Sequence, residues 1–297
     1  MKRMKNLVVP TITPFDEKGK IDPEGIKAHF DFLIKAGVKD FYILGTTGEV
    51  FLINIEERKI VAELAVEYVG ERGNIFVQVG SISTKEACDL AQHAESIGAA
   101  GIGAVTPFYF NVSQREMENY YLEIAKSVSN DFSVYLYNLP GCTTNDLLPE
   151  TVSKLARVKN VVGIKNSMED ILRLSRLIDE TPDDFDVIIG SDNILMSAIL
   201  YGAKGSVSGN ANVFPEIFIE FYQAIKEKNY GKAHEKQIII RHIARILKNG
   251  ASLAYFKQAL IYRGFMPIYT RKPLLNLDQK EKDILNNEVK EIIKNYL

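Results

Sequence analysis

Residues 41–79, FYILGTTGEVFLINIEERKIVAELAVEYVGERGNIFVQV, contain the pattern that decides the fold. A short run of aromatic and branched residues, Phe41–Leu44, comes first and is followed by apolar residues at helical spacing around Ile60. Gly70 stands where such a helix would end, and a second apolar run begins at Ile75. This order predicts a strand, a helix and a second strand parallel to the first.

The same alternation continues along most of the chain. Eight short apolar runs are candidate strands, namely Leu7–Ile12, Phe41–Leu44, Ile75–Val79, Ile102–Val105, Val134–Tyr137, Val161–Lys165, Val187–Ile189 and Ser206–Ser208. Eight strand and helix repeats predict a closed parallel TIM (β/α)8 barrel in the α/β class. The runs are nearly continuous rather than alternating, which fits strands covered by helices on the outside. An open, doubly wound sheet is the structural alternative.

The length of the chain allows one barrel and something more. A chain of 297 residues with 46% hydrophobic content can bury the core of one large barrel or of two modest domains. No Pro, Gly or Ser-rich linker marks a boundary. Further helical patterns follow the eighth run, at about 215–228, 230–248, 251–263 and 278–295. We therefore expect a barrel over 1–224 and a C-terminal helical extension, packed on the barrel, over 225–297.

Charge and cysteine content favour a small-molecule partner. The 36 Lys and Arg nearly balance the 38 Asp and Glu, and no long run of one sign indicates a nucleic-acid or membrane surface. Cys88 and Cys142 cannot form a disulfide framework, which suggests a reducing compartment. The first apolar run is short and broken by Pro10, so no segment is expected to cross a membrane. These features predict a cytoplasmic protein.

Catalytic groups of a TIM barrel lie at the carboxyl ends of its strands. The polar residues found where the apolar runs end are Gly45-Thr46-Thr47-Gly48-Glu49, Thr106-Pro107-Phe108-Tyr109, Tyr137-Asn138, Lys165 and Gly190-Ser191-Asp192. Lys165 directly follows four apolar residues, and desolvation at that position favours the neutral, nucleophilic amine. Such lysines form Schiff bases with keto substrates. A structural salt bridge is the alternative for a single lysine.

Two neighbouring segments support the nucleophile. Tyr137 ends the preceding strand, so its hydroxyl can exchange protons with a substrate, although packing is the commoner role of such a tyrosine. Thr46 and Thr47 lie between two glycines and offer hydroxyls and backbone N–H groups that suit a carboxylate. The alternative is an ordinary turn in which the threonines cap the next helix.

Metal and nucleotide chemistry have little support. The four histidines all fall within helical patterns rather than at strand ends, which disfavours a zinc enzyme. Glu49 and Asp192 are the two acidic residues at strand ends, too few for a magnesium enolate site. There is no GxGxxG after the first strand and no phosphate-binding P-loop motif. We expect neither a metal nor an organic cofactor.

Five motifs together indicate a family. They are GTTGE at 45–49, TPFYF at 106–110, YNLP at 137–140, GIK at 163–165 and GSD at 190–192. In this order they resemble the dihydrodipicolinate synthase and N-acetylneuraminate lyase family of class I aldolases. That superfamily also contains 2-keto-3-deoxygluconate aldolases and sugar-acid dehydratases. The resemblance covers about residues 1–295, including the C-terminal helices.

The resemblance implies a role for each motif. Lys165 matches the Schiff-base lysine, Tyr137 the proton-relay tyrosine, and Thr46 with Thr47 the pair that binds the pyruvyl carboxylate. Tyr109 matches a tyrosine that reaches into the active site of a neighbouring subunit, which implies a homotetramer built as a dimer of dimers. The expected catalytic residues are therefore Lys165, Tyr137, Thr47 and Tyr109. The expected substrate-binding residues are Thr46, Thr47, Gly48, Ser167, Gly190, Asp192, Asn193 and Val207.

Departures from the family pattern bear on the substrate. Dihydrodipicolinate synthases usually carry an arginine two residues after YNxP, where this chain has Cys142, and cysteine cannot bind a carboxylate bidentately. Phe108-Tyr109-Phe110 replaces the usual YYN, and Asn166-Ser167 replaces Glu-Ala after the lysine. Ser167, Asp192 and Asn193 fall where sialic-acid lyases and keto-deoxy sugar-acid aldolases bind substrate hydroxyls.

The sequence therefore predicts a lyase that reversibly cleaves or condenses a 2-keto acid, with pyruvate as the common component and an aldehyde as the partner. A keto-deoxy sugar acid or a sialic-acid-like compound is the expected substrate. A keto-deoxy sugar-acid dehydratase and a dihydrodipicolinate synthase are the enzymatic alternatives. A non-catalytic barrel that only binds a keto acid is the alternative of another class.

Overall fold

The computed structural model describes residues 1–297, and its eight strands follow one another around a closed parallel barrel. They are β1 (Asn6–Val9), β2 (Asp40–Ile43), β3 (Asn74–Gln78), β4 (Gly101–Val105), β5 (Ser133–Asn138), β6 (Val161–Asn166), β7 (Asp186–Ile189) and β8 (Gly205–Val207). This confirms the predicted TIM barrel and excludes an open sheet. All eight expected strands are present with shifted ends. The strand expected over Leu7–Ile12 ends three residues earlier, at Val9, because Pro10 has no N–H to donate to a neighbouring strand.

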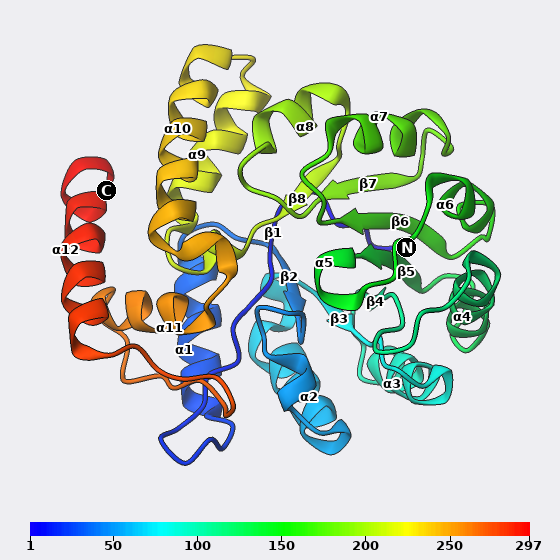
Figure 1. Ribbon diagram of the computed structural model, residues 1–297, viewed down its shortest axis with the longest axis horizontal. Coiled ribbons are helices and arrows are strands. Elements are labelled where there is room, and N and C mark those ends of the chain that lie inside the picture. Colours follow the sequence, from blue (N-terminus) through cyan, green and yellow to red (C-terminus); the bar gives the residue numbers. More distant parts are fainter. The chain divides into compact units, whose positions relative to one another are not determined.

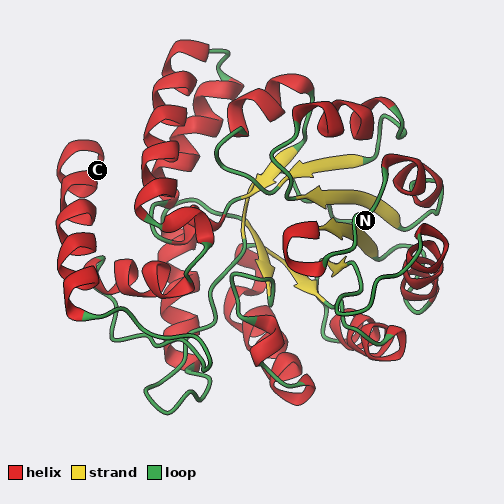
Figure 2. Cartoon of the chain, in the orientation of Figure 1, coloured by secondary structure: helices red, strands yellow, loops and turns green.

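The chain forms two compact units, and the first comprises residues 1–8 and 74–207. In this unit Tyr137 pairs with Lys165 across β5 and β6, and Lys165 pairs with Ile188 of β7. Helices flank the strands on their outer side (Figures 1 and 2). They are α3 (Thr84–Ser96), α4 (Gln114–Lys126), α6 (Pro149–Leu155), α7 (Ile171–Asp179) and α8 (Leu195–Tyr201). The short helix α5 (Pro140–Thr143) follows β5 and does not belong to this outer ring (Figure 1).

The second unit comprises residues 9–73 and 208–297 and contains β2. Its helices are α1 (Pro23–Lys35), α2 (Ile55–Val69), α9 (Pro215–Lys226), α10 (Tyr230–Ile246), α11 (Leu253–Tyr262) and α12 (Gln279–Tyr296). Within it α9 and α10 pack side by side, and α11 contacts α12 (Figure 1). The four C-terminal helices fall in the expected segments. The division into 1–224 and 225–297 stays a prediction.

No helix of the chain combines the length and the apolar content that a bilayer crossing requires. The longest helix, α12, begins with a capping box, in which Asp278 accepts from the backbone N–H of Glu281 at 2.8 Å and the Glu281 carboxylate accepts from the N–H of Asp278. Its buried residues, Leu285, Val289 and Ile292, lie on one stripe at helical spacing. The helix is therefore amphipathic, with one apolar side.

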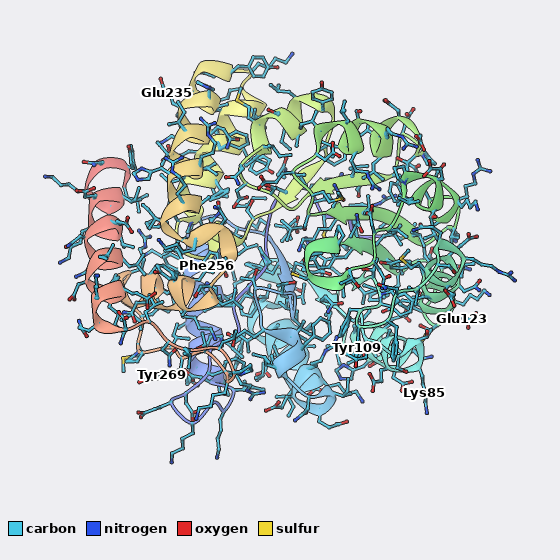
Figure 3. The ribbon with its side chains drawn as sticks, viewed as in Figure 1. Lys85, Tyr109, Glu123, Glu235, Phe256 and Tyr269 are labelled. Atoms are coloured by element: carbon cyan, nitrogen blue, oxygen red, sulfur yellow. The ribbon has the colours of Figure 1, made fainter.

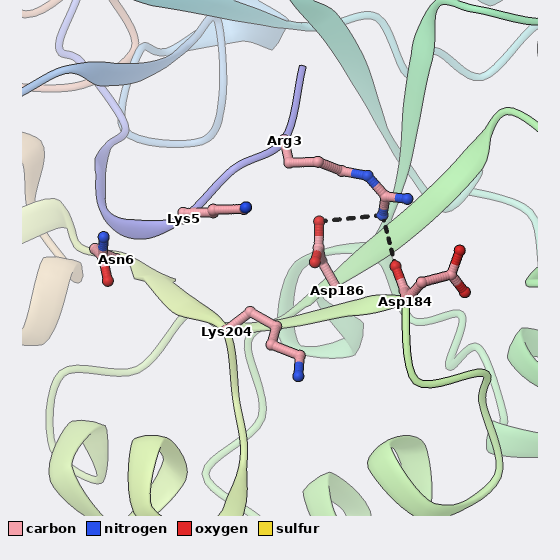
Figure 4. Close-up of a pocket in the computed structure, with 6 residues that line it drawn as sticks. All are labelled: Arg3, Lys5, Asn6, Asp184, Asp186 and Lys204. Carbon is pink, nitrogen blue, oxygen red and sulfur yellow. Dashed lines mark hydrogen bonds and ion pairs between the residues drawn. The ribbon is translucent and has the colours of Figure 1, made fainter. Parts of the chain in front are cut away.

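An ion pair and several hydrogen bonds hold the N-terminal arm at the amino ends of the strands in the first unit. A cavity of about 490 Å³ lies there, lined by Arg3, Lys5, Asn6, Asp184, Asp186 and Lys204 (Figure 4). Arg3 donates to the carbonyl of Val162 at 2.6 Å and approaches the Asp186 carboxylate at 3.3 Å. The hydroxyl of Tyr135 donates to the same carboxylate at 2.8 Å. These groups hold the arm at the end of the strands opposite to Lys165.

Candidate active site

Lys165 and Tyr137 meet near the carboxyl ends of β5 and β6. Parallel pairing sets the two residues opposite each other, so both side chains leave the sheet on the same side. The Lys165 ammonium lies 3.8 Å from the centroid of the Tyr137 ring. Both residues are buried, with exposed fractions of 6% and 3%. A lysine held against a tyrosine ring provides a nucleophile and, on the same ring, a hydroxyl that can carry protons.

Asn138 fixes the backbone directly beyond this pair. Its side-chain amide donates to Asn166 at 3.2 Å and to Asp146 at 2.9 Å, and its side-chain oxygen accepts from the N–H of Leu147. The backbone N–H of Ser167 donates to the carbonyl of Asn138 at 3.0 Å. These contacts join the ends of β5 and β6 to the loop after β5, which makes the position of the neighbouring Lys165 and Tyr137 well determined.

Tyr109 lies on a loop rather than beside Lys165. Its backbone φ of 74° is unusual for a residue with a side chain, and 81% of the residue is exposed. Figure 3 labels its position. The ring makes an edge contact with Phe110 at 5.0 Å. Asn145 holds the loop by donating to the carbonyls of Pro107 and Phe110, each at 2.8 Å. The Tyr109 side chain is therefore exposed to solvent, while hydrogen bonds from Asn145 fix the backbone on both sides of it.

The segments after β6 and β7 also carry predicted substrate contacts. A Cβ atom on Gly190 would lie 2.1 Å from the hydroxyl oxygen of Ser167, so the glycine provides the space that this hydroxyl occupies. Asp192 is buried, with an exposed fraction of 8%. Asn193 donates its amide to the Glu169 carboxylate at 2.7 Å. These residues gather on the two loops that begin beside Lys165 and its partner Ile188 in the sheet.

Glu169, on the loop after β6, is a residue near the candidate site that the sequence analysis did not identify. The same carboxylate oxygen that accepts from Asn193 also accepts from the Ser191 hydroxyl at 2.7 Å. Glu169 is itself exposed. Two donors on one oxygen orient the carboxylate and leave its second oxygen for another hydrogen-bond donor. Its position four residues after Lys165 was the available signal.

Val207 ends β8 and is 2% exposed. It pairs in the sheet with Val8 of β1. Val207 thus lies at the end of β8, as expected. Its side chain is apolar, so it can offer a substrate apolar surface and backbone groups but no side-chain hydrogen-bond donor.

The second unit holds the turn that carries Thr46, Thr47 and Gly48. The turn comprises Gly45–Glu49, and both Leu44, which precedes it, and Glu49, its last residue, have positive φ values, of 57° and 58°. Inside it the N–H of Gly48 donates to the carbonyl of Gly45, and the N–H of Glu49 donates to that of Thr46, each at 3.0 Å. Gly48 is buried while Thr46 is exposed. The turn therefore presents its first threonine on the surface of this unit.

The threonines do not cap the helix that follows. Asn54 does so, because its side-chain oxygen accepts from the N–H of Glu57 at 2.9 Å in a complete capping box. The interpretation of Thr46 and Thr47 as helix caps is wrong, since the turn and the helix are separated by a short 3-10 segment, Val50–Leu52.

Position 142 lies on an exposed short helix. Cys142 is exposed within α5, and no basic residue occurs between Gly141 and Glu150. A basic side chain from α7 does reach this loop, because Arg173 forms an ion pair with Asp146 and donates to the carbonyl of Leu147 at 3.3 Å. The guanidinium of Arg173 is therefore already engaged with an acidic residue of the loop.

Histidine and acidic residues are not arranged for a metal. No group of three or more His, Cys, Asp or Glu side chains is placed so that it could hold a metal ion. His29, on α1, is buried and lies 3.3 Å from the carbonyl of Asn212, and burial lowers its pKa to about 4. Glu49 is held in an ion pair with Lys257.

Comparison with known proteins gives the family. The model of the dihydrodipicolinate synthetase family matches residues 3–292. The chain belongs to this family. Its members are lyases, aldolases and synthases of the class I type, so the enzyme class expected from the sequence is confirmed.

Individual relatives differ in what they act on. Over 292 residues the chain is 34% identical to a probable 2-dehydro-3-deoxy-D-pentonate aldolase of Escherichia coli, with 95% of each chain covered. The structure of dihydrodipicolinate synthase DapA-2 from Bacillus anthracis is similar, with a TM-score of 0.94, 29% identity and coverage of 98% of this chain and 99% of that one. A prophage protein of the same family from Escherichia coli, solved in complex with pyruvate, has a TM-score of 0.93, 29% identity and coverage of 97% and 98%.

Proposed function

We propose that this protein is an aldolase that cleaves or forms a carbon–carbon bond in a 2-keto acid through an imine on Lys165. The observation that carries the proposal is the buried pair at the ends of β5 and β6, where the Lys165 ammonium lies 3.8 Å from the Tyr137 ring. Pyruvate is the common component, as the complex of the similar prophage protein suggests.

The chemistry follows from these two side chains. The neutral amine of Lys165 attacks the keto carbon, and loss of water gives an imine whose protonated form withdraws electrons. The bond between C3 and C4 then breaks, the electron pair moves into the imine to give an enamine, and the C4 carbon leaves as an aldehyde. Tyr137 donates its hydroxyl proton to the departing water when the imine forms, so that its phenolate can then accept the proton from the C4 hydroxyl, and it passes protons in the same way in the later steps. Protonation of the enamine at C3 and hydrolysis release pyruvate and free Lys165.

Thr46 and Thr47 are proposed to bind the carboxylate of the keto acid. Hydroxyl and N–H donors stabilise a carboxylate, and a bound carboxylate fixes the keto carbon relative to the attacking amine. Gly48, Gly190 and Val207 are proposed to complete this part of the site with backbone groups and, at Val207, with apolar surface.

The substrate proposed is a keto-deoxy sugar acid. Ser167, Asp192 and Asn193 offer hydrogen-bonding groups suited to neutral hydroxyls, and Glu169 adds an acceptor oriented by two donors. The same carboxylate repels a second carboxylate on the incoming aldehyde. Cys142 supplies no cation to such a group. The similarity to a probable 2-dehydro-3-deoxy-D-pentonate aldolase agrees with this choice.

Two further functions use the same imine. A dehydratase would eliminate water from a keto-deoxy sugar acid instead of an aldehyde, and a dihydrodipicolinate synthase would condense pyruvate with aspartate semialdehyde. The similarity to the Bacillus anthracis synthase favours the second of these at the level of the fold. The exposed Tyr109 supports a homotetramer in which this ring enters the site of a neighbouring subunit. A cytoplasmic location stays a prediction.

A panel of 2-keto acids tests the proposal. The purified enzyme is incubated with pentonate- and hexonate-derived 2-keto-3-deoxy acids and with N-acetylneuraminate, and pyruvate release is measured. We expect pyruvate from at least one sugar acid and slow or absent turnover of pyruvate with aspartate semialdehyde. Release of a dehydrated keto acid without pyruvate would identify a dehydratase instead.

A further inference from the structure

Lys257 is a second buried lysine, and it lies on a C-terminal helix and not at the end of a barrel strand. It lies on α11, next in sequence to Phe256, which is labelled in Figure 3, and it is 1% exposed. Its ammonium donates to the carbonyl of Thr13 and to the carbonyl of Tyr269, each at 2.8 Å, and forms an ion pair with the Glu49 carboxylate. An ammonium has three donors, and these three partners use all of them.

Glu49 is the last residue of the Gly45–Glu49 turn. Its side chain is fully buried, and its backbone has the left-handed φ of 58°. A second contact comes from the C-terminal segment, where the backbone N–H of Arg271 donates to the Glu49 carboxylate at 2.8 Å. A residue with a side chain tolerates this backbone conformation when surrounding contacts enforce it. The pair with Lys257 is one such contact.

The network holds the turn from a second side through Thr13. The Thr13 hydroxyl donates to the carbonyl of Gly48 at 2.8 Å, while the Thr13 carbonyl accepts from Lys257. Lys257 is thus connected to both of the last two residues of the turn. The side chain of Arg271 secures the segment that supplies the other contact to Glu49, by pairing with both oxygens of Glu57 at 2.6 and 2.8 Å.

Stability alone is a poor explanation for this arrangement. Burying an ion pair costs desolvation that its attraction often fails to exceed, and an apolar pair of the same volume would frequently be as stable. A buried charge network with defined partners is well suited to fixing one backbone geometry. The geometry fixed here is that of the turn that carries Thr46 and Thr47.

We propose that Lys257 is a positioning residue, which, through Glu49 and Thr13, holds the turn so that Thr46 and Thr47 meet the carboxylate of the keto acid. The proposal rests on the proposed function, in which these threonines bind that carboxylate. Lys257 does not touch the substrate. Its loss should therefore weaken the recognition of carboxylate-bearing ketones and leave imine formation with other ketones intact.

Trapping with borohydride separates these two properties. Imines on the full-length enzyme are reduced over a series of pyruvate concentrations, and in parallel over a series of acetone concentrations, and the adduct on Lys165 is measured by mass spectrometry. For Lys257→Met we expect the half-saturating pyruvate concentration to rise about ten- to a hundredfold, as for the loss of a charge-assisted hydrogen bond. The acetone series should be unchanged, and Lys257→Arg should restore most of the pyruvate affinity.

Lys236→Met is the matched control, because it removes a different ion pair of the same unit, that with Glu220 on α9. Its pyruvate series should match that of the wild type. If Lys257→Met does not fold, Thr13→Val decides the question, since it removes a hydroxyl contact to the turn and should raise the half-saturating pyruvate concentration severalfold.

An equal rise in the half-saturating concentrations of pyruvate and acetone would overturn the positioning role and leave Lys257 with a merely structural one. An unchanged pyruvate series in a folded Lys257→Met protein would also overturn it. Failure of the proposed function has a different signature, because the wild-type protein would then form no pyruvate adduct on Lys165 at all.

Discussion

Two lysines of this chain are almost fully buried, and their surroundings differ in kind. Lys165 is the penultimate residue of β6, is 6% exposed and lies against the ring of Tyr137. Lys257 sits on a helix, is 1% exposed and donates to a carboxylate and two backbone carbonyls. Burial lowers the pKa of Lys257 to about 8, and the Glu49 carboxylate opposes that shift.

The comparison shows that burial alone does not make a lysine a nucleophile. A nucleophilic amine needs its lone pair directed at a substrate, whereas all three donors of Lys257 are used within the protein. Position in the fold supplies the other difference, because the carboxyl end of a barrel strand is where substrates bind. We therefore assign the chemistry to Lys165 and the positioning of the carboxylate-binding turn to Lys257.

Replacing each lysine by methionine should separate the two roles most strongly. Lys165→Met removes the only atom that forms the imine, so turnover should fall to the background rate while the protein stays folded. Lys257→Met leaves the charge of Glu49 buried without its ion-pair partner, which should cost about 3–5 kcal/mol of unfolding free energy. Denaturant titration and pyruvate release measure both. A Lys165→Met enzyme with normal turnover would reverse the assignment.

Tyr137→Phe tests the role of the Tyr137 hydroxyl beside Lys165. It keeps the ring beside the ammonium and removes the hydroxyl, so kcat should fall about 100-fold or more while pyruvate binding is largely kept. Steady-state kinetics together with borohydride trapping decide the matter. An effect confined to KM would make Tyr137 a binding residue instead.

A smaller change in kcat/KM is expected from the group that the substrate carries at its aldehyde end. We expect kcat/KM for a keto-deoxy sugar acid to exceed that for aspartate semialdehyde condensation by at least about ten-fold, because position 142 supplies no cation for the second carboxylate. Cys142→Arg should improve the semialdehyde reaction, and Cys142→Gln, which adds no charge, should not. The opposite ranking of the wild-type substrates would contradict the sugar-acid proposal and leave Lys165 as the nucleophile.

The smallest expected effect concerns the segment beside Lys257. Hydrogen bonds from Arg271 lower the pKa of Glu57, so this pair stabilises the fold above the ordinary glutamate pKa and the stabilisation is lost as the pH falls through the lowered value. Glu57→Gln should reduce the unfolding free energy by about 1 kcal/mol at pH 7 and weaken its dependence on pH below about 4.5.

Glu56→Gln is the matched control for that measurement. Glu56 is the preceding residue of the same helix and approaches Lys59 at 4.0 Å with 82% of its side chain exposed, so its loss should change little. If the unfolding free energies of the wild-type and Glu57→Gln proteins depend on pH in the same way, the ion pair between Glu57 and Arg271 does not stabilise the fold.

Sequence patterns were sufficient for the barrel because each strand is a local apolar run. The strand ends were less predictable, as with Pro10 and with Leu44, whose φ of 57° ends β2 one residue early. The pairing of Tyr137 with Lys165 followed from both residues ending successive strands. The contacts of Glu169 and Lys257 were not predictable, because their partners are distant in sequence and a single charged residue in a loop or helix carries no periodic signal.

The most direct test of the account is reduction with borohydride in the presence of pyruvate, followed by peptide mass spectrometry. An imine is reducible and a hydrogen-bonded ammonium is not, so we predict one stable adduct, on Lys165, and none on Lys257. A folded protein whose mass is unchanged by pyruvate at neutral pH, or an adduct on Lys257 in place of Lys165, would show that Lys165 is not the nucleophile.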